Sequence, residues 1–153
     1  MIQRDHGPIA ADAYELATAL ERLVALVRRL APQPDISIST ASTMRALETS
    51  GPCRLSDLAA REGVTQPAMT QLVSRLERDG HARRRPGTED ARVVLVHLTP
   101  AGADLLRYRR QARAERLHAL MDKLPPRDRA AIRGALPALT LLVELGEGPS
   151  RDR

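Results

Sequence analysis

Residues 55–99 contain two short stretches with the periodicity of helices, a glycine between them, and then an arginine-rich segment that alternates like a β-hairpin. In the first stretch the inward positions are Leu58 and Ala59, and Ser56 is a suitable N-cap. Gly63 can adopt the left-handed conformation that ends a helix at little steric cost. The pattern predicts a helix of about two turns that stops at a tight turn.

The second stretch predicts a helix whose two faces differ in chemistry. Thr65 can cap it, and Pro67 is tolerated in the first turn because its missing N–H needs no helical partner there. Gly80 ends the helix. The apolar positions follow the spacing i, i+3, i+4, i+7, and they are Met69, Leu72, Val73 and Leu76.

Two helices joined by a tight turn can place the exposed face of the second helix in the major groove of DNA. Base edges are read by amides and hydroxyls near the start of such a helix, whereas arginines further along meet phosphates. The alternative is an ordinary solvated helix face. The candidate base readers are Gln66, Thr70 and Gln71. The full set of candidate DNA-contacting residues on this helix is Gln66, Pro67, Ala68, Thr70, Gln71, Ser74, Arg75 and Arg78.

Residues 81–98 change to the period of β-strands. Residues 81–85 form a short run, residues 86–90 have turn composition, and residues 92–98 are β-branched, with Val94, Val96 and Leu98 on one face. Apolar residues on the other face of this second strand indicate that both faces are covered; they are Val93 and Leu95. The segment therefore predicts a hairpin with a polar tip, and with the two helices a winged helix-turn-helix.

Positive charge gathers where such a wing would follow the DNA backbone or enter the minor groove. Asp90 and Arg92 are two residues apart, on the same side of an extended strand, and could brace one another. The alternative is a basic hairpin that is only surface. The candidate wing residues are Arg83, Arg84, Arg85, Asp90 and Arg92.

Further helices are predicted on both sides of this region. They cover Ala11–Leu30, then residues 37–49 with Met44, Leu47 and Ile38 inward, then a long helix from Thr99-Pro100 to about Leu124, and a last helix over Arg127–Leu145 with a kink at Pro137. We expect one mainly α (α+β) domain over residues 1–153. Within it, residues 37–99 form the winged helix-turn-helix, residues 11–34 and 100–146 form dimerisation helices, and residues 147–153 form a disordered tail.

The composition favours an anionic partner. The formal net charge of the 153 residues is +5, which suits nucleic acid. Arginine supplies nearly all the basic residues, a bias that genomic base composition can also produce, so the positions of the arginines carry more weight than their number. Tyr14 and Tyr108 are the only aromatic residues, which disfavours a base-stacking RNA platform.

Other function classes find little support. Cys53 is the only cysteine, so an internal disulfide is excluded; we expect it in a loop, in a structural role. The four histidines are scattered, so no metal site or cofactor is expected. No phosphate-binding glycine loop, nucleophile elbow or triad suggests an enzyme. No run approaches the ~20 apolar residues that span a bilayer, so we expect a soluble, cytoplasmic protein with no membrane partner.

The order and spacing of several short motifs resemble the multiple antibiotic resistance regulator (MarR) family of bacterial transcription factors. The resemblance covers Ile38 to Gly102, and the flanking helices agree in number and placement. The motifs are Leu58-Ala59 in the first helix, Leu72-Val73 followed by Leu76-Glu77 and Gly80 in the second, Asp90-x-Arg92 at the wing, and Leu98-Thr99-Pro100-Ala101-Gly102 after it.

The resemblance implies a dimer whose N-terminal and two C-terminal helices interlock, with each winged domain reading half of a pseudo-palindrome. It also implies that Arg92 approaches the minor groove and that Asp90 holds it. The position between them, often basic in the family, is Ala91 here, which would weaken that contact. Members commonly respond to small phenolic or other amphipathic ligands, but no residue of this sequence identifies one. A peroxide-sensing branch uses a cysteine near the N-terminus, where this chain has none.

We therefore expect a homodimeric regulator of transcription that binds double-stranded DNA at the nucleoid, and we predict that it is a repressor. One alternative is an architectural DNA-binding protein that uses the same wing without sequence preference. Another is a helical protein-interaction module, which would leave the basic hairpin without a role.

Overall fold

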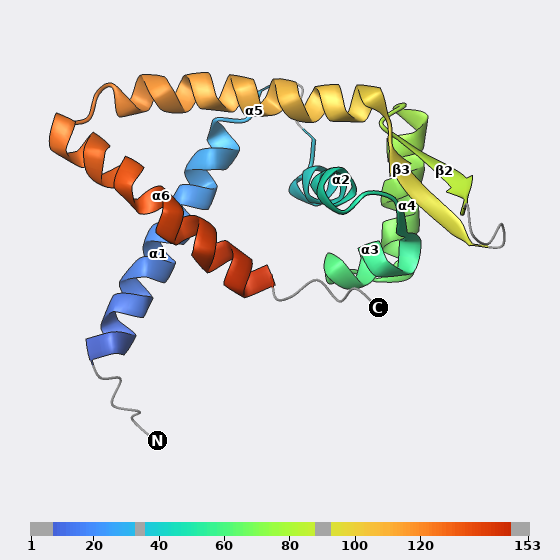
Figure 1. Cartoon of the computed structure of the whole chain (residues 1–153), viewed down its shortest axis with the longest axis horizontal. Helices are drawn as coiled ribbons and strands as arrows, with labels where there is room; N and C mark the ends of the chain where they lie inside the picture. The colour runs from blue at the N-terminus through green and yellow to red at the C-terminus, as the bar shows by residue number, and fades with distance from the viewer. Residues whose placement is uncertain (1–7, 33–35, 88–92, 148–153) are drawn as a thin grey trace. The chain divides into compact units, whose positions relative to one another are not determined.

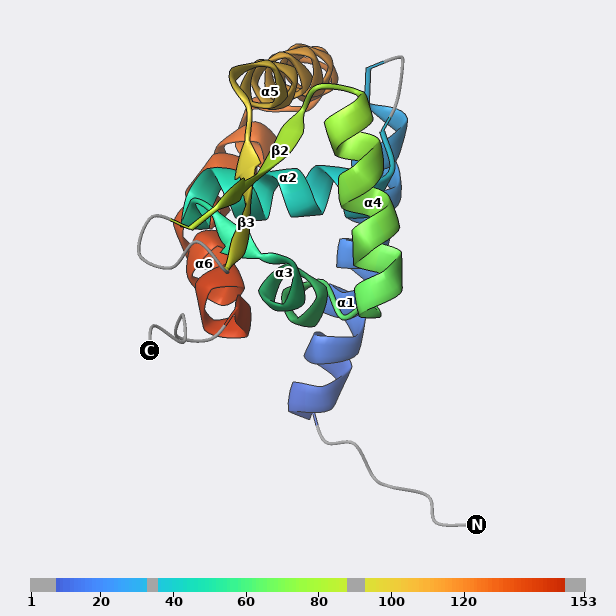
Figure 2. The ribbon, with the colours of Figure 1, turned by 90° about the vertical axis from the view of Figure 1, so that its right-hand side faces the viewer.

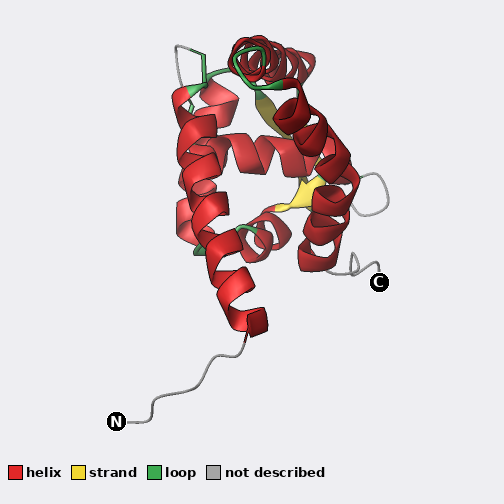
Figure 3. Cartoon of the chain, turned by 90° about the vertical axis from the view of Figure 1, so that its left-hand side faces the viewer, coloured by secondary structure: helices red, strands yellow, loops and turns green. Residues whose placement is uncertain are grey.

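The computed structural model describes residues 8–32, 36–87 and 93–147. Helices predominate, and the strands form one small sheet (Figures 1 and 3). The chain divides into two compact units, residues 1–113 and 114–153. In chain order the elements are α1 (Pro8–Arg29), α2 (Ile38–Ser50), β1 (Cys53–Arg54), α3 (Leu55–Arg61), α4 (Gln66–Arg78), β2 (Ala82–Pro86), β3 (Val94–Leu98), α5 (Pro100–Met121) and α6 (Pro126–Glu147).

The first unit has its core where α2, α3 and α4 meet the sheet. One predicted inward position in each of these helices is fully confirmed, because Met44, Leu58 and Met69 are each at most 1% exposed. Removing such apolar side chains from water is the main favourable contribution to folding. The remaining core residues are Ala46, Leu47, Ala59, Leu72, Val73, Leu76, Ala82, Val96 and Leu106.

The turn between α3 and α4 follows the sequence prediction. Gly63 has a φ of 63°, in the left-handed region that favours glycine. The Val64 N–H donates to the Ala59 carbonyl at 3.0 Å, which closes the end of α3. At the start of α4, the Thr65 hydroxyl accepts from the Ala68 N–H at 3.4 Å, as expected of an N-cap.

The start of α3 differs from the prediction. The N-cap is Arg54 and not Ser56, and no side chain caps the helix. Ser56 lies inside the first turn, where its hydroxyl donates to Asp57 at 3.1 Å. The reason is that Arg54 still belongs to β1, so the helix begins directly where the strand ends.

Strand β1 was also missed, because Cys53 was expected in a loop. It pairs antiparallel with β3, Cys53 opposite Val96 and Arg54 opposite Leu95. The strand order is therefore β1-β3-β2, and β3 is the central strand. Its Val96 is buried, whereas Val94 is half exposed because it lies opposite Pro86 at the outer end of the hairpin.

Helix α5 begins at the predicted cap. The Thr99 hydroxyl accepts from the Gly102 N–H at 3.1 Å and donates to the Gly80 carbonyl at 2.6 Å, which ties the helix start to the end of α4. The helix ends at Met121, three residues before the predicted Leu124.

The flanking helices differ from the predictions mainly at their ends. Helix α1 begins at Pro8, before the predicted Ala11. Ile38 is 50% exposed and is not inward as expected. In the second unit, α6 passes through Pro137 and reaches Glu147. The rest of the predicted tail, residues 148–153, lies outside the described residues.

Candidate nucleic-acid interface

Helix α4 presents a polar face to solvent because its apolar stripe is buried in the core. Met69, Leu72, Val73 and Leu76 are buried. All eight residues predicted to contact DNA from this helix are exposed: Gln66, Pro67, Ala68, Thr70, Gln71, Ser74, Arg75 and Arg78.

The polar side chains of this face are not equally available. The Thr70 hydroxyl donates to the Gln66 carbonyl at 2.8 Å, and the Ser74 hydroxyl is held by Arg84. Neither Gln66 nor Gln71 has its side-chain amide in a hydrogen bond with another described residue. Gln66 and Gln71 are therefore the best placed to bond a base edge.

Helix α4 lies beside the β2–β3 hairpin (Figure 2). Arg83 and Arg85 project from one face of the hairpin and are exposed, whereas Arg84 projects from the other face toward α4. The two other predicted wing residues, Asp90 and Arg92, lie outside the described residues.

Uncompensated positive charge lies on two parts of the surface: Arg75 and Arg78 are on α4, and Arg83 and Arg85 are on the hairpin face that points away from α4. None of them pairs with a carboxylate in the described part of the chain. Such a surface suits a polyanion, since each neutralised phosphate releases condensed counterions and adds to affinity.

One further arginine was missed by the sequence prediction. Arg54 is exposed and lies opposite Leu95 in β1, while Arg85 lies opposite Leu95 from β2. The two arginines thus share one row across the sheet and one of its faces. A two-residue strand leaves no periodic signal, so only the register of the sheet could have identified Arg54.

The first unit also contains a cavity of about 360 Å³. Its apolar wall comes from α1, α2 and the segment between them, including Val24, Val27 and Ile36. Four arginines line it as well, namely Arg28, Arg45, Arg109 and Arg113. An apolar wall with cationic groups suits a small amphipathic anion.

Cys53 is half-buried, and its thiol donates to the Gly51 carbonyl at 3.3 Å. Burial raises the pKa of this thiol, an effect that Arg61 opposes and Asp57 reinforces. The thiol is therefore a weak nucleophile at neutral pH.

The described residues offer neither a metal site nor a membrane-spanning helix. Their histidines, cysteine and carboxylates form no group of three that could hold a metal ion. None of their helices has the length and apolar character needed to cross a membrane.

Comparisons with known proteins agree with this geometry. The sequence model of the MarR family matches residues 36–94. An HTH-type transcriptional regulator of Mycobacterium leprae is 33% identical over 132 residues, which cover 86% of this chain and 92% of the relative. The crystal structure of RV1404 from Mycobacterium tuberculosis has a TM-score of 0.78 and 28% identity, and the match covers 95% of this chain and 99% of that one. BpsR of Bordetella bronchiseptica, whose DNA binding is regulated by 6-hydroxynicotinic acid, has a TM-score of 0.56 and 22% identity, over 92% of this chain and 97% of that one.

Proposed function

The chain belongs to the MarR family of helix-turn-helix transcriptional regulators, and on that premise we propose that it is a homodimeric repressor acting on a pseudo-palindromic operator. The family is a class of regulators and not of enzymes. A regulator of this kind works at the bacterial nucleoid, in the cytoplasm. Repression is the simplest outcome, because a dimer that spans an operator covers DNA that the transcription machinery needs.

The proposal rests on two sets of exposed side chains that lie on adjacent elements: amides on α4 and arginines on β2. Gln66 and Gln71 are exposed on α4, while Arg83 and Arg85 are exposed on the neighbouring strand β2. Base-edge contacts from a helix in the major groove supply sequence preference, and phosphate contacts from the hairpin supply affinity. Arg92 remains the candidate for the minor groove, with Asp90 as its brace.

Dimerisation is supported by apolar surface that a single chain leaves exposed. On α6, Leu136, Leu142 and Leu145 are 56%, 47% and 72% exposed. Helix α1 likewise exposes Tyr14 and Leu16. Large apolar side chains left exposed on long helices indicate a contact with another chain, and a two-fold partner would present the same residues in return.

Ligand response is supported by the cavity lined by α1 and α2. A ligand bound there would change DNA affinity only by its different affinity for the DNA-bound and free arrangements. The regulation of BpsR by 6-hydroxynicotinic acid shows that such control occurs in a protein of this fold. For the present chain we propose a small amphipathic anion, phenolic or carboxylic.

The decisive experiment is the selection of bound duplexes from random DNA by the purified protein. The proposal expects a pseudo-palindrome whose half-sites are about one helical turn apart. Binding without any preferred sequence would instead support an architectural DNA-binding protein. Absence of DNA binding would support a helical protein-interaction module, and either result would overturn the proposal.

A further inference from the structure

Arg84 is separated from its neighbours by the geometry of its strand. Successive side chains of a strand point to opposite faces, so Arg84 shares the face of β2 that carries the buried residue Ala82, and it lies opposite the buried Val96. Arg83 and Arg85 share the other face and are exposed. The run of three arginines therefore divides into two groups with different surroundings.

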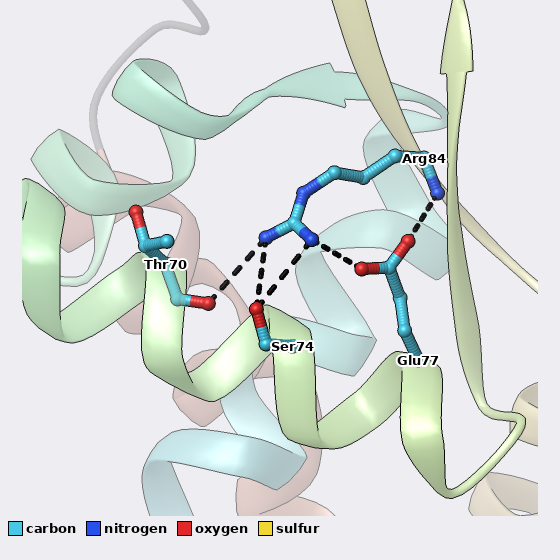
Figure 4. Close-up of polar contacts among 4 residues, drawn as sticks. All are labelled: Thr70, Ser74, Glu77 and Arg84. Carbon is cyan, nitrogen blue, oxygen red and sulfur yellow. Dashed lines mark hydrogen bonds and ion pairs between the residues drawn. The ribbon is translucent and has the colours of Figure 1, made fainter.

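The guanidinium of Arg84 is held by three residues of α4 (Figure 4). It forms an ion pair with Glu77, contacts the Ser74 hydroxyl at 3.4 Å and donates to the Thr70 carbonyl at 3.4 Å. The three partners are spaced i, i+4 and i+7, so they form one stripe along the helix.

Glu77 also binds the backbone of the strand. Its second carboxylate oxygen accepts the Arg84 N–H at 2.7 Å. One carboxylate thus fixes both the main chain and the side chain of Arg84, and a planar guanidinium with several donors makes the contact directional. We call the group Thr70, Ser74, Glu77 and Arg84 the wing bracket.

The wing bracket is better suited to orientation than to stability or phosphate binding. The side chains of Arg84 and Glu77 are 30% and 29% exposed, and ion pairs near solvent add little net stability. A guanidinium already neutralised by a carboxylate also adds little to counterion release. What the bracket does fix is the position of β2 relative to the exposed face of α4.

We propose that Arg84 is a positioning residue that sets sequence specificity by locking the wing to the recognition helix α4. The inference rests on the proposed function. Phosphate contacts from Arg83 and Arg85 then determine how Gln66 and Gln71 meet the bases, because hairpin and helix move as one body. The same contacts assign Ser74 to the bracket and not to base reading.

The test compares the affinities of variants for the selected operator and for a scrambled duplex over a range of salt concentrations. Arg84→Ala is expected to lower the ratio of the two affinities by about tenfold, roughly the cost of one mismatched base pair, and to leave the salt slope unchanged. The matched controls are Arg83→Ala and Arg85→Ala. Each leaves the other arginine to anchor the hairpin on the backbone, so each should weaken binding to both duplexes about equally and reduce the slope by about one.

Glu77→Gln tests the bracket from the other side. The amide removes the negative charge but keeps an oxygen that can accept the Arg84 N–H. The ratio of affinities should again fall about tenfold, while binding to the scrambled duplex strengthens because Arg84 is released to meet phosphate.

Two results would overturn the inference. A reduced salt slope for Arg84→Ala would make Arg84 a phosphate contact, and an unchanged ratio with an unchanged slope would make it merely structural. Circular dichroism checks the fold, and Arg84→Lys, which keeps the charge but loses the fork, replaces Arg84→Ala if truncation unfolds the chain. If the wild-type protein binds the operator and the scrambled duplex equally well, the proposed function itself fails. If the wild-type protein prefers the operator and the variants keep the same preference, only the role of the wing bracket is rejected.

Discussion

Gln71 is the residue on which base reading can be tested most directly. Its exposed amide can bond adenine in two places, and a contact of that kind is worth about 1–3 kcal/mol of discrimination. We expect Gln71→Ala to weaken binding to the operator by about tenfold and to leave binding to a scrambled duplex nearly unchanged. Fluorescence anisotropy with both duplexes measures the two losses. Equal losses on the two duplexes would show that Gln71 does not read a base.

Cys53 provides a prediction about pH. Because its pKa is raised in the folded chain, the folded state binds the thiol proton more tightly than the unfolded state does. The resulting stability is present below the unfolded pKa of the thiol and is lost as the pH rises through the folded pKa. Alkylation by iodoacetamide should therefore begin at higher pH in the folded protein than in urea. An earlier onset in the folded protein would indicate an activated thiol and contradict the structural role.

At the scale of the elements, the start of α5 leaves no room for an added side chain at Gly102. A Cβ added to Gly102 would lie 2.3 Å from the His81 carbonyl oxygen and 2.7 Å from the Leu98 side chain. We expect Gly102→Ala to lower the free energy of unfolding by about 1–3 kcal/mol, the usual cost of overpacking. Urea denaturation at a fixed protein concentration measures the change.

The matched control for this helix start is Gly134 in α6. A Cβ there meets nothing within 4 Å, so Gly134→Ala should stabilise the chain by up to about 1 kcal/mol through helix propensity. If the two substitutions had the same effect, the packing of α5 against the hairpin would not be the cause.

The elements that the sequence predicts best are those whose signals are local. The stripe of α4 and its cap at Thr65 lie within a few residues of one another, and both are confirmed. Strand β1 exists only because it pairs with β3, about forty residues later in the chain, and two residues have no period to detect. The false cap at Ser56 has the same origin, because the undetected strand supplies the start of α3.

The candidate site shows the same division between local and tertiary information. The exposure of the α4 face followed from its apolar stripe, as the structure shows for Gln66 and Gln71. The attachment of Arg84 to Glu77 required the register of β2 and its contact with α4. In the sequence Arg83, Arg84 and Arg85 look equivalent. In the structure Arg83 and Arg85 are exposed, whereas Arg84 is bound to Glu77.

At the scale of the whole molecule, the cavity predicts a response to small anions. Benzoate should raise the melting temperature of the protein and weaken its binding to the operator. Uncharged benzamide should have a smaller effect on both quantities. Arg45 lines the cavity and is exposed, so Arg45→Ala should cost about 1 kcal/mol of benzoate affinity. Titration calorimetry measures the difference. Equal binding of benzoate and benzamide would contradict an anion-selective site.

The exposed leucines of α6, Leu136, Leu142 and Leu145, predict the oligomeric state on which operator binding depends. Size-exclusion chromatography with light scattering should give twice the 16.8 kDa mass of one chain at micromolar concentration. Leu142→Asp places a charge in the proposed interface and should yield a monomer, because a buried unpaired charge is costly. Leu142→Met keeps the apolar surface and should remain dimeric.

A monomer would also lose most of its preference for the full operator, because it can occupy only one half-site. In a dimer, binding of the first half-site raises the effective concentration of the second chain at the other half-site. Its affinity for scrambled DNA should fall much less, because each chain keeps its own arginines. A wild-type protein that stays monomeric at micromolar concentration, or a Leu142→Asp variant that stays dimeric, would mean that the exposed leucines of α6 are covered by something other than a second copy of this chain.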